Sequence, residues 1–157
     1  MDRRTGIAML TVLAALPGMA AAGGNVAEAF AAALSAHDLK AFAALFAEDY
    51  AQHQTSAAAP KPPPGLSAKQ NTVNYFAARL TALPDLKVVA DPVVVAGDMV
   101  AANFTYSGTH RATYFGIAPT GRRVVFNSCD ILMVRNGLIA AHWGAADVAG
   151  LLAQLHA

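Results

Sequence analysis

The change of hydrophobic period at Pro84 constrains the fold most strongly. Before this residue, apolar side chains recur every three or four positions, as on one face of an α-helix. After it, β-branched and aromatic residues dominate and turn signals separate them. Helices gathered first and strands gathered afterwards are typical of an α+β domain. We therefore expect a curved antiparallel sheet covered by N-terminal helices, with a C-terminal helix and a cone-shaped pocket.

Three helices are predicted in the first half of the chain. Residues 25–46 carry two apolar stripes, and Asp38 between them suits the N-cap of a second short helix. Ser67 and Gln70 form a capping box at the start of a third helix, which Pro84 ends.

The connections and strands follow from breaks in these patterns. Polar residues interrupt the helical period at 48–55, and the four prolines within 56–65 predict an exposed loop. Two strands are expected at about 86–95 and 99–107, joined by a turn at Gly97. A last helix is expected from about Asp147 to Leu155.

The Asn136-Gly137 pair is a strong hairpin signal between a long strand and a returning strand. In a two-residue hairpin at this position, directly opposed residues have numbers that sum to 273, and they share a face. The predicted pairs are Asp130 with Trp143, Ile131 with His142, and Leu132 with Ala141. Provided that no bulge intervenes, the rings of His142 and Trp143 then point to opposite faces.

Asp130 is the main candidate for acid/base chemistry. It shares its strand face with Phe126, Leu132 and Val134, where a carboxylate is costly unless it is hydrogen-bonded, paired or protonated. An apolar pocket can bring the pKa of such a group toward the working pH. The alternative is a rim residue, or a hydrogen-bond acceptor without chemistry.

His53 is the second catalytic candidate, because it stands in the polar break where a pocket mouth could lie; a solvated loop histidine is the alternative. Trp143 is predicted as a pocket wall, with core packing as its alternative. The other predicted pocket residues are Ala141, Leu132, Tyr50, Phe76 and His142. For His142, packing is favoured because the register turns it away from Asp130. His110 is expected to bond to turn backbone.

The first 22 residues have the layout of a secretory signal peptide, with a basic start, an apolar run at 7–16, a Pro17-Gly18 break and small residues. About ten apolar residues fall short of the roughly 20 that a membrane-spanning helix needs. We therefore expect an exported, periplasmic or extracellular protein of one domain, residues 23–157, without stable membrane insertion after cleavage. A first helix of the folded domain is the alternative for this segment.

Charge and cysteine content exclude several classes of function. Removal of residues 1–22 leaves nine basic and nine acidic residues, and no basic cluster suggests a nucleic-acid partner. Cys129 is the single cysteine, so it forms no intrachain disulfide, and no Cys/His spacing suggests a metal site. No cofactor is predicted.

Several segments together resemble the SnoaL-like polyketide cyclase/ester cyclase family. They are "HDLKAFAALFAEDYAQH" (37–53), "LPDLKV" (83–88), "SGTH" (107–110), "FGIAPTGRRVVF" (115–126), "CDILMVRNGLIAAHW" (129–143) and "LLAQL" (151–155). The resemblance implies the cone-shaped α+β fold of nuclear transport factor two, scytalone dehydratase and ketosteroid isomerase. It also implies homodimerisation through the sheet.

The resemblance also implies a change at the site. The position of the family's acid/base carboxylate is occupied by Ala141 here, and the position of an assisting histidine is occupied by Asp130. Two functions stay open. The first is a cofactor-free lyase, isomerase or cyclase that acts on a small apolar carbonyl compound. The second is a non-catalytic exported protein that binds a hydrophobic small molecule in the same pocket.

Overall fold

The structure, a computed structural model, describes residues 20–54 and 61–157, with side chains from Val26 onward. Residues 1–19 of the predicted signal peptide and 55–60 of the predicted loop lie outside the described residues. The elements in chain order are α1 (Ala20–Ser35), α2 (Leu39–Ala44), β1 (Phe46–Gln52), α3 (Ala68–Ala82), β2 (Lys87–Ala96), β3 (Met99–Thr109), β4 (Arg123–Arg135), β5 (Leu138–Ala146) and α4 (Val148–His156).

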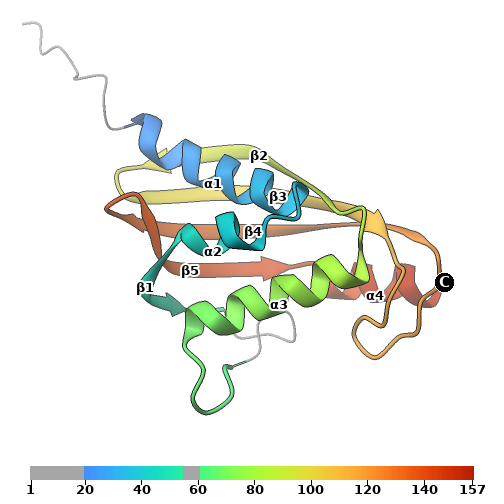
Figure 1. The fold of residues 1–157 in the computed structure, drawn as a ribbon. Coiled ribbons are helices and arrows are strands. Elements are labelled where there is room, and N and C mark those ends of the chain that lie inside the picture. The colour runs from blue at the N-terminus through green and yellow to red at the C-terminus, as the bar shows by residue number, and fades with distance from the viewer. Residues whose placement is uncertain (1–19, 55–60) are drawn as a thin grey trace, which may run out of the picture.

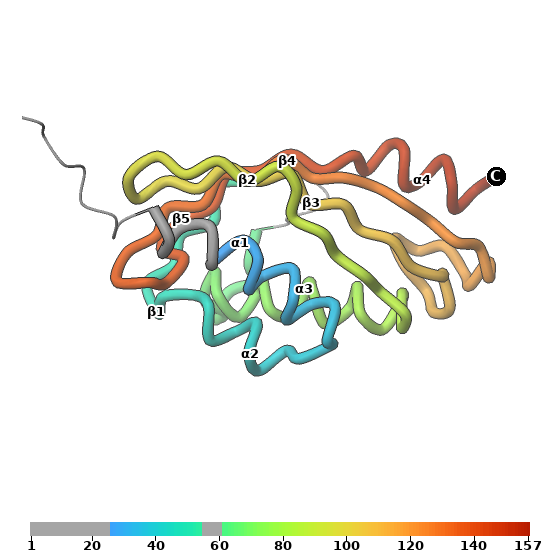
Figure 2. The backbone as a smooth tube through the Cα atoms, turned by 90° about the horizontal axis from the view of Figure 1, so that it is seen from above, coloured from blue at the N-terminus to red at the C-terminus, as the bar shows by residue number. Residues whose placement is uncertain are grey.

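The strands form one curved sheet in the order β1-β5-β4-β3-β2, with α1, α2 and α3 against one face (Figures 1 and 2). All neighbouring strands are antiparallel except β1 and β5, which are parallel. The predicted α+β architecture is therefore confirmed. The concave side of the sheet and the helices that cover it enclose the space in which a site can form.

The predicted helix starts are confirmed by their capping contacts. The Asp38 carboxylate accepts a hydrogen bond from the Ala41 amide at 2.8 Å, and Ser67 and Gln70 form a complete capping box. Asp147 accepts from the Gly150 amide at the start of α4. These side chains satisfy amide groups that have no partner within their own helix.

Strand β1 was not predicted, because the segment was interpreted as the end of a helix followed by a polar break. Phe46 and Ala51 pair with Ile139 and Ala141, with an irregularity between them. The partner strand lies about 90 residues further along the chain. Local hydrophobic period carries little information about a short edge strand whose partner is so distant.

An aromatic cluster joins the helices to the sheet. The Phe30 ring of α1 contacts the rings of Phe42, Phe46, Phe76 and Phe104, with centroids 4.8–6.4 Å apart. Most of these pairs are edge-to-face or tilted, the arrangements that aromatic quadrupoles favour. Because Phe76 belongs to α3, this cluster fixes α3 over the sheet.

The hairpin turns at the predicted position, but the predicted register is wrong beyond the first two residue pairs. Val134 pairs with Ile139, as the sum of 273 requires, whereas Met133 pairs with Ala141 and Leu132 with His142. Ala140 is the extra residue of a β-bulge between these pairs. Because side chains alternate along a strand, one extra residue exchanges the two faces of β5 beyond it.

Candidate active site

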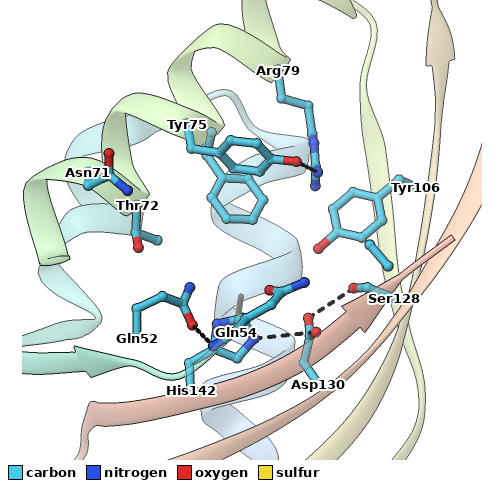
Figure 3. A pocket seen from close by; sticks show the side chains of 12 residues that line it. Gln52, Gln54, Asn71, Thr72, Tyr75, Arg79, Tyr106, Ser128, Asp130 and His142 are labelled. Carbon is cyan, nitrogen blue, oxygen red and sulfur yellow. Dashed lines mark hydrogen bonds and ion pairs between the residues drawn. The ribbon is translucent and has the colours of Figure 1, made fainter. Parts of the chain in front are cut away.

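A pocket lies between α3 and the concave face of the sheet (Figure 3). Its empty volume is about 440 Å³, which includes open solvent at the mouth. The residues that line it come from the end of β1 and from α3, β3, β4 and β5: Gln52, Gln54, Asn71, Thr72, Tyr75, Phe76, Arg79, Tyr106, Ser128, Asp130, His142 and Ala146. The lining combines three aromatic rings with polar and charged side chains, the groups that can fix the orientation of a small ligand.

Asp130 and His142 meet in this pocket because of the bulge. His142 Nε2 lies 3.3 Å from Asp130 Oδ1, and both side chains are largely buried. The Ser128 hydroxyl donates a hydrogen bond of 2.9 Å to Asp130 Oδ2. His142 Nε2 makes no aligned hydrogen bond in the described structure, although it is buried. The nitrogen nearest the carboxylate is thus close to it without an aligned hydrogen bond.

The other ring nitrogen of His142 lies beside a buried phenol. Tyr50 Oη is 3.4 Å from His142 Nδ1. Burial raises the pKa of Tyr50, so its hydroxyl stays protonated and can donate to Nδ1. A donor at Nδ1 puts the proton of a neutral imidazole on Nε2, the nitrogen that faces Asp130.

Gly144 makes room for this pair. It lies opposite Asp130 in the hairpin, and a Cβ atom there would collide with Asp130 Oδ1 and lie 2.8 Å from His142 Nε2. A side chain at this position would therefore occupy the space in which the carboxylate and imidazole approach one another. Glycine is required by the close packing of the two functional groups.

Gly144→Ala should displace the Asp130 carboxylate and lower the free energy of unfolding by about 1–3 kcal/mol, as overpacking of a filled site does. Urea unfolding measures the stability, and NMR of the His142 ring reports its surroundings. Ala145→Val is the matched control, because Ala145 is exposed on the other strand face. An unchanged His142 spectrum in Gly144→Ala would contradict the expected displacement.

Arg79 lines the opposite side of the pocket and is only 4% exposed. Its Nε donates to Tyr114 Oη at 2.9 Å and its Nη2 to Tyr75 Oη at 2.7 Å. Four aromatic rings surround the guanidinium, those of Tyr75, Phe76, Tyr106 and Phe126, with centroids 4.6–5.1 Å from Cζ. Cation–π attraction and two hydroxyl acceptors hold this buried charge in place.

The tyrosines around Arg79 remain neutral. Burial raises the pKa of Tyr75 to about 12, although the charge of Arg79 opposes this shift. Burial also raises the pKa of Tyr106, which is fully enclosed. Near neutral pH these phenols are therefore polar but uncharged neighbours of the cation.

The structure brings together only some of the predicted site residues. Asp130, His142 and Phe76 line the pocket. Tyr50 and Leu132 are buried behind its wall, and Ala141 is buried without lining it. His110 is fully buried, and its Nδ1 lies 3.2 Å from the Thr120 amide, which confirms its predicted contact with turn backbone.

The predicted positions of Trp143 and His53 are wrong. Trp143 is 38% exposed and pairs with Ile131 on the outer face, because the bulge exchanges it with His142. The His53 ring stacks on Trp143 with centroids 4.6 Å apart. Gln52 and Gln54 line the pocket, whereas His53 between them is exposed and does not line it.

Sequence reasoning missed Arg79, Tyr75, Tyr106 and Ser128. Tyr75 and Arg79 are four residues apart on α3, so they share a helix face with each other and with Phe76. Tyr106 of β3 pairs with Phe126 of β4, and Ser128 pairs with Phe104 and lies two residues before Asp130 on β4, so all of these side chains share the inward face. An arginine on the apolar stripe of a helix is the one signal that could have been noticed.

Within residues 20–54 and 61–157, no three His, Cys, Asp or Glu side chains gather closely enough to hold a metal ion. No helix in the same ranges combines the length and the hydrophobicity that crossing a bilayer requires.

Comparisons with known proteins identify the family. The model of the SnoaL-like polyketide cyclase family matches residues 24–155. No functionally curated protein matches the sequence significantly.

Solved structures of similar fold include three from Streptomyces. TsrD from Streptomyces laurentii is 27% identical, with 87% of this chain and 96% of that chain covered and a TM-score of 0.73. IdmH from Streptomyces antibioticus, a candidate polyketide cyclase, is 26% identical, with 86% and 99% covered and a TM-score of 0.73. AclR from Streptomyces galilaeus, a candidate hydroxylase, is 24% identical, with 88% and 98% covered and a TM-score of 0.74. By its sequence match and its fold, the chain belongs to the SnoaL-like polyketide cyclase family.

Proposed function

We propose that this protein is a cofactor-free enzyme of the cyclase, isomerase or lyase type, which moves protons on a small apolar carbonyl compound. The observation that carries the proposal is the contact of Asp130 with His142 inside an aromatic pocket. A carboxylate and an imidazole are the side chains that most often serve as general base and acid. The similarity to IdmH, a candidate polyketide cyclase, supports the same type of chemistry.

The proposed reaction begins with proton abstraction. Asp130 takes a proton from the carbon next to the carbonyl group, the C–H electron pair becomes the C=C bond, and the carbonyl π pair moves to oxygen. The carboxylate becomes a carboxylic acid, and the substrate becomes an enolate. The enolate then follows one of two routes, and its C=O bond is restored in both. Either the α-carbon, or a more distant carbon conjugated with it, takes a proton, or the α-carbon attacks a second carbonyl carbon, whose oxygen receives the π pair and then the proton.

His142 and Ser128 act on the base in this proposal. The Ser128 hydroxyl holds Oδ2 by its hydrogen bond, which leaves Oδ1 toward the substrate and His142. The imidazole can orient the carboxylate through Nε2 and return a proton to the product. The carboxylate has room for these contacts because Gly144, opposite it on β5, has no side chain.

The aromatic rings in the lining support a ligand with an apolar body. Tyr75, Phe76 and Tyr106 supply these rings, whereas polar side chains such as Gln52 and Thr72 could fix the orientation of the ligand. We also propose that the mature chain is exported and forms a homodimer. The order of basic, apolar and small residues in 1–22 supports the first of these proposals.

The test is exchange of the α-protons of 2-tetralone, an apolar bicyclic ketone, in deuterium oxide, followed by proton NMR. The wild-type protein should accelerate exchange with saturation in ketone concentration. With the Asp130→Asn/His142→Asn double variant, the exchange rate should be close to the rate in buffer alone. Circular dichroism should show an unchanged fold.

The same assay separates the two functions that the sequence leaves open. Saturable binding of 2-tetralone without accelerated exchange would contradict the enzyme and favour a binding protein. Acceleration that survives in the double variant would contradict the proposed base. Exchange by the wild-type protein that depends on both residues would support the proposal.

A further inference from the structure

Arg79 is a buried cation without an anionic partner. Among the residues that the structure describes, the guanidinium forms no ion pair; the carboxylates of Glu48 and Asp49 pair with Lys69 and Arg135, and that of Asp130 contacts His142. The hydrogen bonds of the guanidinium go to the phenol oxygens of Tyr114 and Tyr75 rather than to a carboxylate. A buried charge is normally paired with an opposite charge, because loss of hydration costs several kcal/mol.

The contacts of Arg79 hold one edge of the guanidinium and leave donors for a ligand. Nε and one N–H of Nη2 are used by Tyr114 and Tyr75. An arginine has five N–H groups in a fixed planar fork. This fork can donate to two oxygen atoms, or donate two hydrogen bonds to one oxygen. Arg79 also lines the pocket, so an anion that enters could reach these remaining donors.

The cation and the proposed base stand on different walls of one pocket. Figure 3 shows Arg79 reaching down from α3 and Asp130 reaching up from β4, with Tyr106 and Ser128 beside the space between them. Tyr106 connects the two ends, since its ring contacts the Arg79 guanidinium at 4.6 Å and the charge of Asp130 acts on its hydroxyl. A substrate in this space would meet a carboxylate at one end and a guanidinium at the other.

We propose that Arg79 binds the substrate oxygen that carries or develops negative charge, so that the substrate class is a ketone or 1,3-dicarbonyl compound whose enolate oxygen points to α3. This inference rests on the proposed function, because it concerns the same pocket. Proton abstraction moves one negative charge from the Asp130 carboxylate to the substrate oxygen. Arg79 stabilises that oxygen more strongly after the transfer than before it, which is the requirement for lowering the barrier.

A structural role for Arg79 makes a different prediction. If the charge of Arg79 served only to join α3 to Tyr114, its removal would lower the affinity of the pocket for every ligand alike. If Arg79 binds an anionic oxygen, its removal would lower the affinity for anions selectively. Comparison of a charged ligand with a neutral one of the same shape separates these two roles.

The experiment uses 4-nitrophenol as a stable enolate analogue and 4-nitrotoluene as its neutral counterpart. The background is the full chain with Asp130→Asn, so that the neighbouring carboxylate neither repels the phenolate nor turns over a substrate. Absorbance gives the ionised fraction of bound 4-nitrophenol, because the phenolate absorbs visible light and the phenol does not. Equilibrium dialysis gives the affinity for 4-nitrotoluene.

With Arg79 present, bound 4-nitrophenol should ionise at a lower pH than the free compound. In Arg79→Met, the pKa of bound 4-nitrophenol should rise by about one unit or more, which is about tenfold in phenolate affinity. The affinity for 4-nitrotoluene should change less than about twofold, because a methionine keeps the packing volume. Arg79→Lys should retain most of the preference for the phenolate, because it keeps the charge.

Equal losses for both ligands in Arg79→Met, an unchanged pKa of the bound phenol, or binding of neither compound would each overturn the inference. A second measurement does not require the methionine variant to fold. The nitrogen-15 NMR signals of the Arg79 guanidinium should shift on addition of 4-nitrophenol and not of 4-nitrotoluene, and absence of the shift would also overturn it. Failure of the proposed function would appear separately, as loss of ketone exchange with phenolate binding intact.

Discussion

Asp130→Asn should slow the α-proton exchange of 2-tetralone by about 100- to 10,000-fold, the range that one general acid/base group contributes. The amide has the shape of the carboxylate but cannot accept a proton from carbon. Ser128 can still hydrogen-bond to the amide oxygen, so we expect ligand affinity and fold to be retained. Initial rates by NMR at several ketone concentrations separate the two effects, because KM should change little while kcat falls.

His142→Asn should have a smaller effect, about tenfold or more, because the imidazole orients the carboxylate and returns a proton without being the first base. The two substitutions remove groups in direct contact, so their effects should not add in the double variant. Cys129→Ser is the matched control: Cys129 adjoins Asp130 but is exposed on the outer face. A loss of exchange in His142→Asn that exceeds the loss in Asp130→Asn would reverse the assigned roles.

Phe30→Ala should lower the free energy of unfolding by about 3–5 kcal/mol, the usual cost of removing a buried phenylalanine. Phe30 contacts four other rings from α2, β1, α3 and β3, so the loss includes both the buried area and the edge-to-face contacts. Because the cluster also holds α3, the position of Arg79 over the sheet depends on it. Urea denaturation measured by circular dichroism gives the change.

Val89→Ala provides the comparison for that measurement. Val89 is exposed on β2, so its truncation should change the free energy of unfolding by less than about 0.5 kcal/mol. A change below about 1 kcal/mol in the free energy of unfolding for Phe30→Ala would contradict the packed cluster, because removal of a fully packed ring from a core costs more than this.

Much of the fold could be predicted because its signals are local. The caps at Asp38, Ser67 and Asp147 lie within three residues of the amides that they satisfy. The Asn136-Gly137 turn has both residues at positive φ, a conformation that asparagine and glycine adopt more readily than other residues. Asp130 could be singled out because a carboxylate on an apolar strand face is unusual wherever its partner lies.

The rest of the site depends on contacts that are distant in sequence. His142 turned out to share the face of Asp130 because of the bulge at Ala140, and the run of small apolar residues around it gives no local signal for an extra residue. Strand β1 forms only against β5, so its residues show no strand pattern of their own. The surroundings of Arg79 combine residues of α3, β3, β4 and the loop after β3, which a helical period alone cannot bring together.

The bulge at Ala140 also has a consequence for how members of such a family can diverge. Deletion of this one residue would restore the simple hairpin register and exchange the neighbours of Asp130, so that Trp143 would enter the pocket and His142 would face outward. The altered pocket would have an indole beside Asp130 where the imidazole had been. A single-codon deletion could in this way remove one of the two groups of the proposed acid/base pair, and an insertion could restore it.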